Sequence, residues 1–225
     1  TRVRSSAASD VYKRQGYIDA LVDAQSHIDG YFFLEESLSP ALLDAMQKVC
    51  PITPNQDGAE TPAYVYSHYF LGRRATALAR IDLLNKLSQN FDVTVYTHAD
   101  CKDILPTAIY GGKIDYYDTM PTVFQHSKIN LNITLKTIQT GIPLRAWDIL
   151  GCSGFLLTNF QQELCDFFIP GEDFVYYESP PDAIEKAAYF LSHDRERQEI
   201  AHNAFEKIAA SHTFHHRVQS MFDII

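Results

Sequence analysis

One short segment of this chain, PLRAWDILGCSGFLLTN at residues 143–159, carries side chains that could bind a charged ligand. Arg145 and Asp148 stand three residues apart, at the start of a short apolar helix, so both are expected on one face of it. A guanidinium can form a two-pronged contact with a phosphate. A carboxylate repels phosphate, but it can accept hydrogen bonds from both hydroxyls of a ribose. The pair therefore points to a nucleotide-sugar.

The residues before this helix point to the same kind of ligand. Gly141 is followed by Pro143, and proline is favoured in the first turn of a helix. The first N–H groups of a helix have no partner within it and carry partial positive charge, which suits a diphosphate. The alternative is a plain Arg145–Asp148 ion pair at the rim of a core helix, worth about 0.2–0.5 kcal/mol. The spacing alone leaves both open.

Two other segments offer polar groups for which a structural role is favoured. Arg73 and Arg74 follow a glycine and could contact phosphates, or they could form a solvated charge pair on a helix. Gly171 and Glu172 could form a wall of the donor pocket, or they could simply make the turn before a strand.

The remaining polar candidates are predicted to be structural. Asn130 and Asn132 alternate with apolar residues in an expected strand, where hydrogen bonds within the fold account for them. His212 and His216 have a spacing that could bind a metal on a helix, but no carboxylate or cysteine joins them, so no metal site is predicted. His126 is not expected to act as a catalytic base.

Composition narrows the class of protein. The 225 residues are 46% apolar, enough for one large domain or for one domain plus part of another. The net charge of -9 argues against nucleic acid or an anionic membrane as a partner. No stretch approaches the roughly 20 apolar residues of a transmembrane segment. The four cysteines match no zinc site, and we expect free, mostly buried thiols in a reducing cytoplasm.

The first part of the chain is predicted to be helical. Residues 1–15 are polar and aperiodic and look like a translated junction sequence, so they are left out of the fold prediction. Helical patterns follow within residues 16–50, one of them capped by Ser39 with Pro40 at its first position. The proline-rich residues 50–62 read as a linker.

After residue 88 strands alternate with helices. Strands are predicted at residues 92–97, 129–134, 155–159 and 174–177, and helices at residues 63–88, 120–127, 162–168, 180–194 and 195–210. This alternation implies βαβ units and a parallel sheet. Ligands of such sheets bind outside the carboxyl ends of the strands, so the loops after residues 97, 134, 159 and 177 are the ones to inspect.

From about Tyr69 to its C-terminus, the chain closely resembles the CgeB-like, spore-maturation-type glycosyltransferases, which belong with the group 1 glycosyltransferases of the GT-B fold. The resemblance rests on a strand followed in order by Gly-Ile-Pro-x-Arg, Asp-Ile-x-Gly, Phe-Leu-x-Thr-Asn and Pro-Gly-Glu-Asp. It implies a Rossmann-like C-terminal domain over residues 63–225, with a parallel sheet flanked by helices. Residues 16–62 would then be a helical remnant and linker of a truncated N-terminal domain.

The resemblance also implies an activity. The C-terminal domain would bind a nucleoside-diphosphate sugar, and the complete enzyme, hexosyltransferase-like, would transfer the sugar to an unknown acceptor docked on the missing N-terminal domain. Asp148 would hold the donor ribose, Arg145 precedes it at the family's spacing, and the loop at Thr140 and Gly141 would pass the diphosphate or sugar. Arg73 and Arg74 match a basic spot near the domain junction. No metal or other cofactor is implied, the catalytic residues stay unknown, and the fragment alone would turn over poorly.

One departure from the family keeps two alternatives open. Many relatives carry two glutamates eight positions apart, whereas the position eight before Asp148 is Thr140, so the first acid is absent. A non-catalytic spore or cell-surface assembly protein that keeps the fold is slightly favoured by this change. A nucleotide-sugar epimerase on the same fold is the other alternative.

Overall fold

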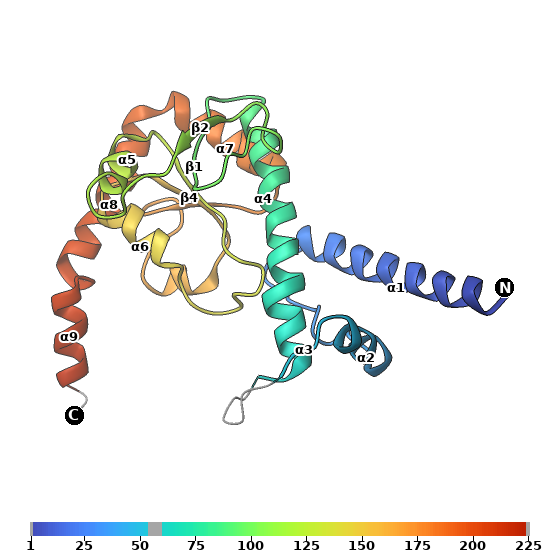
Figure 1. Ribbon diagram of the computed structural model, residues 1–225. Helices are drawn as coiled ribbons and strands as arrows, with labels where there is room; N and C mark the ends of the chain where they lie inside the picture. The colour runs from blue at the N-terminus through green and yellow to red at the C-terminus, as the bar shows by residue number, and fades with distance from the viewer. Residues whose placement is uncertain (1, 54–59, 224–225) are drawn as a thin grey trace. The chain divides into compact units, whose positions relative to one another are not determined.

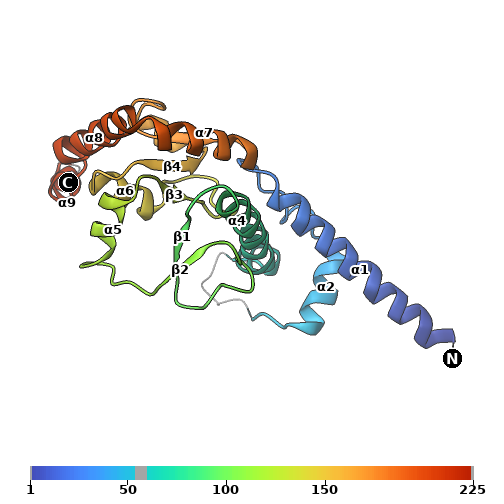
Figure 2. The same ribbon diagram turned by 90° about the horizontal axis from the view of Figure 1, so that it is seen from above.

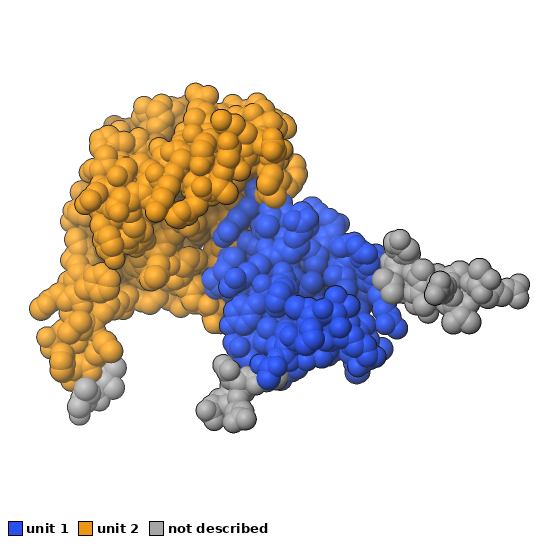
Figure 3. Space-filling view, viewed as in Figure 1, with its two compact units in different colours: residues 1–80, 135–139 blue, residues 81–134, 140–225 orange. Residues whose placement is uncertain are grey.

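The computed structural model describes residues 2–53 and 60–223 of the chain, with side chains from residue 13 onward. Contacts divide the chain into two compact units (Figure 3). Unit 1 consists of Thr1–Arg80 together with the short segment Leu135–Gln139, and unit 2 consists of Ile81–Thr134 and Thr140–Ile225. The division therefore falls inside a helix at residue 80, eighteen positions after the end of the expected linker at residue 62.

The N-terminal part of the chain is helical, as predicted (Figure 1). Its elements are α1 (Arg2–Ser26), α2 (Pro40–Val49), α3 (Pro62–Tyr64), a π-helix (Val65–Gly72) and α4 (Arg73–Ser88). The Ser39 side chain caps α2 by accepting a hydrogen bond from the N–H of Leu42, which confirms the predicted start. Helix α1 runs through Gly16 without a break, so the stretch left out of the prediction is part of it. Of the expected linker, residues 54–59 lie outside the described residues.

Unit 2 contains two parallel sheets instead of the single one predicted. Strands β3 (Asn130–Asn132), β4 (Leu156–Asn159) and β5 (Val175–Tyr177) form a three-stranded parallel sheet in that order. Strand β1 (Thr94–Tyr96) pairs in parallel with β2 (Ile109–Gly112), which the sequence analysis missed. All four predicted strands are present, but the first belongs to the separate two-stranded sheet.

Helical segments follow β2 in unit 2, and among them α6 contacts β3 and β4 while α7 contacts β5. They are α5 (Met120–His126), α6 (Leu144–Gly151), a 3₁₀ turn (Gln162–Asp166), α7 (Pro180–Ser192), α8 (Asp194–Ser211) and α9 (Phe214–Phe222), of which only α9 was not anticipated. In Figure 2, α7 and α8 follow one another along one side of the sheet.

Strand β4 is buried on both faces, which places it at the centre of unit 2. Phe155 and Leu157 pack with α7 and α8, together with α4 residues such as Leu87. The intervening Leu156 packs in a second cluster with Ile149 of α6. Because alternate strand residues point to opposite faces, the sheet carries apolar cores on both sides. Parallel strands between helical layers confirm the predicted Rossmann-like α/β class.

The cysteines are free, but they are not mostly buried as predicted. Cys50 and Cys165 are exposed, and Cys101 and Cys152 are half-buried. Within the described residues, no helix has both the length and the apolar composition needed to cross a membrane.

Helix α6 ends in a tight turn that delivers the chain to β4. Ser153 adopts a left-handed backbone at φ 57°, and the N–H of Gly154 donates to the carbonyl of Ile149 at 2.9 Å, as in a Schellman motif. Gly154 allows the close approach, since a Cβ there would lie 2.9 Å from the Phe124 carbonyl oxygen and 3.0 Å from that of Ile149. Gly151 plays no part in this approach, because a Cβ there would meet only the Ile208 side chain, at 4.0 Å.

These contacts predict opposite effects for two glycine substitutions in the same turn. Gly154→Ala should lower the free energy of unfolding by about 1–3 kcal/mol, because the new methyl group meets two backbone oxygens. Gly151→Ala is the matched control and should be neutral or stabilising by up to about 1 kcal/mol, because this helical position is open. Chemical denaturation of both variants measures the difference. Equal stability of the two would contradict the packing described at Gly154.

Candidate functional site

Helix α6 carries the two leading candidate residues and begins after the loop that leaves β3. It contacts both β3 and β4. One face of it is fully buried and carries Ala146, Ile149 and Leu150. The exposed Arg145 and the half-buried Asp148 occupy another face, as the spacing predicts. The sheet therefore fixes the helix by its apolar face and leaves the charged pair for other partners.

The start of α6 has the properties of an anion site. Pro143 is the N-cap, one position before the first helical residue, and makes no side-chain capping hydrogen bond. The N–H groups of the first turn are therefore not capped by its side chain, and the helix dipole adds positive charge there. Gly141, two residues earlier, is exposed and adopts φ +98°, a left-handed conformation that favours glycine. Thr140 beside it is also exposed.

Asp148 accepts a hydrogen bond from a residue that the sequence analysis did not single out. The Tyr116 hydroxyl donates to Asp148 Oδ2 at 2.8 Å. Tyr116 lies between β2 and α5, 32 residues before Asp148, and no local pattern links the two. Among the described residues, no ion pair joins Arg145 to Asp148. The purely structural alternative, a local Arg–Asp pair, is therefore not formed.

The loop that carries Tyr116 is held by a neighbouring carboxylate. Asp115 Oδ1 accepts hydrogen bonds from the backbone N–H groups of Tyr117 and Asp118, both at 2.8 Å. These two bonds lower the pKa of Asp115 below its usual value. The Tyr117 ring packs edge-on against Tyr116, with 5.1 Å between ring centres, and is 83% exposed. Tyr116 therefore lies at the Asp148 carboxylate, and Tyr117 packs against Tyr116.

Asp148 also changes the proton affinity of its neighbours. The pKa of Tyr116 is raised, first by its hydrogen bond to Asp148 and then by burial and by the negative charge of that carboxylate. The pKa of the Cys152 thiol is raised by burial, with the Asp148 charge adding to it. Cys152 therefore stays protonated at neutral pH and is not an activated nucleophile.

Gly171 and Glu172 lie in the turn before β5. Because this turn precedes its strand, it lies at the amino edge of the sheet, whereas the start of α6 follows the carboxyl end of β3. Gly171 adopts φ +83°, and the Glu172 carbonyl accepts a hydrogen bond from Asn203. Buried Asp173 accepts one from the Ile169 N–H and pairs with a lysine on α8. These contacts account for the turn, and the structure does not bring it to the start of α6.

Arg73 and Arg74 lie at the start of α4, in unit 1, and both are exposed. The Arg73 guanidinium lies 5.4 Å from the centre of the Tyr69 ring, a cation–π distance. A phosphate-binding role for these two arginines stays a prediction.

The side chains expected to be structural do make structural contacts. Asn130 Nδ2 donates to the Phe124 carbonyl, and Asn132 Nδ2 donates to the Thr158 hydroxyl at 3.0 Å. His212 packs among aromatic rings that include Trp147, and His216 takes part in the capping box of α9. The predicted structural roles of both asparagines are confirmed.

Comparison with known proteins identifies the family. The family model described as glycosyl transferase-like matches residues 74–223, about two thirds of the chain, which include the start of α6 and Asp148. The chain therefore belongs to this glycosyl transferase-like family. No curated protein and no solved structure matches it. The match agrees with the expected resemblance at the level of the glycosyltransferase family and implies a sugar donor and an acceptor.

The Tyr116–Asp148 hydrogen bond predicts a raised pKa for the Tyr116 hydroxyl. In the wild-type chain, Tyr116 should titrate above its ordinary pKa of 10.0 and should return toward that value in Asp148→Asn. Because the folded-state pKa is raised, the stabilising contribution is complete below the unfolded pKa and is lost as the pH rises through the folded pKa. NMR titration of ¹³C-labelled tyrosine measures the shift.

Tyr189 is the control for this titration, because its pKa is raised by a hydrogen bond to Glu196 instead. Its titration should be the same in both proteins. A Tyr116 titration that does not respond to Asp148→Asn would contradict the hydrogen bond.

Proposed function

We propose that unit 2 binds the nucleoside diphosphate of a sugar donor at the start of α6, and that the complete protein transfers the glycosyl group to an acceptor. The observation that supports this most is the position of Asp148. It lies on the same helix face as Arg145, one turn beyond a helix start that follows the carboxyl end of a parallel strand. Ligands of open parallel sheets bind at this edge, and the family match covers the whole arrangement.

The charged groups of the site would contact different parts of the donor. The N–H groups at the start of α6 and the Arg145 guanidinium would contact the diphosphate, and Asp148 would accept hydrogen bonds from the ribose hydroxyls. As the glycosidic bond breaks, negative charge builds up on the departing diphosphate. Fixed positive charge at that point would stabilise the transition state more than the bound donor. These residues would act by positioning and electrostatics, and the acceptor would be activated elsewhere.

Two tyrosines would complete the nucleoside end of this site. The Tyr116 hydroxyl donates a hydrogen bond to Asp148 in the ligand-free chain, so this bond would have to break when the ribose binds. The exposed ring of Tyr117 offers a flat surface to a base, and base–aromatic stacking contributes about 1–3 kcal/mol.

The order of the sequence motifs supports a particular glycosyltransferase subtype. Gly-Ile-Pro-x-Arg, Asp-Ile-x-Gly and Phe-Leu-x-Thr-Asn follow one another as in CgeB-like, spore-maturation-type relatives, which supports that subtype and a cytoplasmic nucleotide-sugar donor. The acceptor would dock on an N-terminal domain that also supplies any catalytic base. A non-catalytic assembly protein with this fold is the second candidate, because Thr140 stands where many relatives carry a glutamate.

Calorimetric titration of the chain with UDP, GDP, ADP and dTDP tests the donor site. We expect one diphosphate to bind in the micromolar to millimolar range, at about −8 to −4 kcal/mol. Asp148→Ala should weaken binding at least about tenfold, because a charge-assisted hydrogen bond contributes about 1.5–3 kcal/mol.

Asp82→Ala is the matched control, because Asp82 is also a helical aspartate of unit 2 but pairs with Lys86. It should leave the affinity unchanged. No binding of any of the four diphosphates to a folded chain would overturn the donor site and would favour the non-catalytic candidate.

Tyr116→Phe gives a prediction of opposite sign. Removing the hydroxyl frees Asp148 from its internal partner, so the diphosphate should bind about two- to tenfold more tightly, as a bond of about 0.5–1.5 kcal/mol implies. Tyr117→Phe keeps the exposed ring and should bind like the wild type. Weaker binding by Tyr116→Phe would show instead that the hydroxyl contacts the donor.

A further inference from the structure

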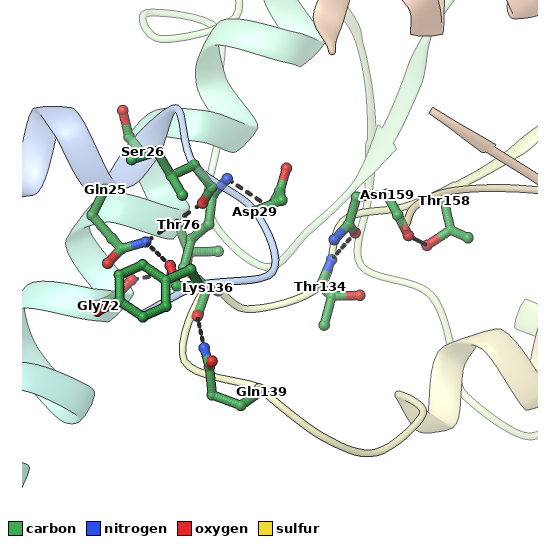
Figure 4. Close-up of polar contacts among 12 residues, drawn as sticks. Gln25, Ser26, Asp29, Gly72, Thr76, Thr134, Lys136, Gln139, Thr158 and Asn159 are labelled. Carbon is green, nitrogen blue, oxygen red and sulfur yellow. Dashed lines mark hydrogen bonds and ion pairs between the residues drawn. The ribbon is translucent and has the colours of Figure 1, made fainter. Parts of the chain in front are cut away.

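The loop that leads to α6 is fastened to unit 1. Residues 135–139 belong to unit 1, although β3 before them and α6 after them belong to unit 2. Figure 4 shows this segment beside α1 and α4 residues, with Lys136 at the centre of the polar contacts.

Lys136 makes two separate contacts there. Its side chain is only 5% exposed, and its Nζ lies 2.7 Å from Asp29 Oδ1. Its backbone N–H donates to the Thr76 hydroxyl at 2.9 Å, and that buried hydroxyl donates in turn to the Gly72 carbonyl. A Cβ at Gly72 would clash with the Thr137 side chain, so the loop lies directly against the helix. Both the side chain and the backbone of Lys136 are therefore held.

The acidic partner sits in a loop that is itself ordered. Gln25 is fully buried, and its Nε2 donates to the Tyr31 carbonyl at 2.9 Å while its Oε1 accepts from the Phe33 N–H at 3.0 Å. These bonds close the backbone turn that contains Asp29, so the partner of Lys136 lies on an ordered turn of unit 1.

A buried lysine by itself contributes little to the stability of a fold. Its ammonium group loses hydration, and a buried ion pair is often no better than apolar side chains of similar volume. An ion pair does, however, demand one geometry, whereas apolar side chains accept several. The Lys136–Asp29 pair thus specifies where the loop lies, and the exposed residues that follow it are those of the candidate donor site, Thr140 and Gly141.

We infer that Lys136 is a positioning residue for the donor site. Its contacts order residues 135–139, the segment that directly precedes Thr140, Gly141 and α6 in the chain, before a ligand arrives. A loop ordered in advance spares the ligand the entropy of ordering it, which strengthens binding. The inference rests on the proposed function of α6 as the diphosphate site.

The test combines two readouts on the full chain. We expect Lys136→Met and Asp29→Asn each to weaken binding of the diphosphate found among UDP, GDP, ADP and dTDP by about five- to tenfold, and the double variant to be no weaker than either. Amide hydrogen exchange without ligand should speed up in residues 135–142 of both single variants. Lys136→Arg keeps the charge and should retain more of the affinity than Lys136→Met.

Lys186→Met is the matched control. Lys186 also makes a 2.7 Å ion pair, to Asp182, and a hydrogen bond to a backbone carbonyl, but it lies on α7 outside the candidate site. It should leave diphosphate affinity unchanged even if stability falls.

The possible failures are distinguishable. A wild-type chain that binds none of the four diphosphates would remove the proposed function, and the positioning role with it. Wild-type binding that survives both Lys136→Met and Asp29→Asn would leave the donor site standing and overturn the role of Lys136. Exchange that speeds up throughout unit 1, and not in residues 135–142 above the rest, would mark the pair as merely stabilising. Should Lys136→Met fail to fold, Asp29→Asn decides alone, because the Asp29 side chain is 38% exposed and asparagine has nearly the same shape.

Discussion

Buried polar side chains at the carboxyl ends of β3 and β4 fix the point from which the candidate site is built. Asn132 Nδ2 donates to the hydroxyls of Thr158 and Thr134. Asn159 Oδ1 accepts a hydrogen bond from the Thr134 N–H at 2.9 Å, which Figure 4 shows. All four residues are buried, so a lost partner would cost about 1–3 kcal/mol. Asparagine and threonine thus do more here than pair strands. They fix the position at which the chain leaves β3. The loop, the start of α6 and Asp148 come after this position in the chain.

From this point onward, each part of the candidate site has its own structural support. The segment 135–139 is held by Lys136, the next residues include the left-handed Gly141, and α6 is again fixed by its buried apolar face. Asp148, on the helix, has a hydrogen-bond partner within the chain, namely Tyr116. Binding of a ribose at this carboxylate would therefore exchange the one Tyr116 hydroxyl for the two hydroxyls of the sugar.

The sequence predicted the elements whose signals are local. The strand at residues 130–132 lies in an alternating segment and those at residues 156–159 and 175–177 in largely apolar ones, and α2 and α7 begin with a capping serine followed by proline. Strand β2 was missed because it ends in two glycines, which are depleted in strands. The π-helix has no recognised sequence pattern and was read as α-helix. The Tyr116–Asp148 and Lys136–Asp29 contacts join residues 32 and 107 positions apart, and no spacing rule reaches that far.

Because its last piece is residues 135–139, unit 1 is not one continuous stretch of chain, and this has a consequence for how the protein is made. During synthesis, Asp29 and Thr76 are produced well before Lys136, so unit 1 lacks its last segment until β3 has also been made. Unit 2 is likewise discontinuous in sequence, because residues 135–139 belong to unit 1. No single cut in the chain therefore yields both units whole.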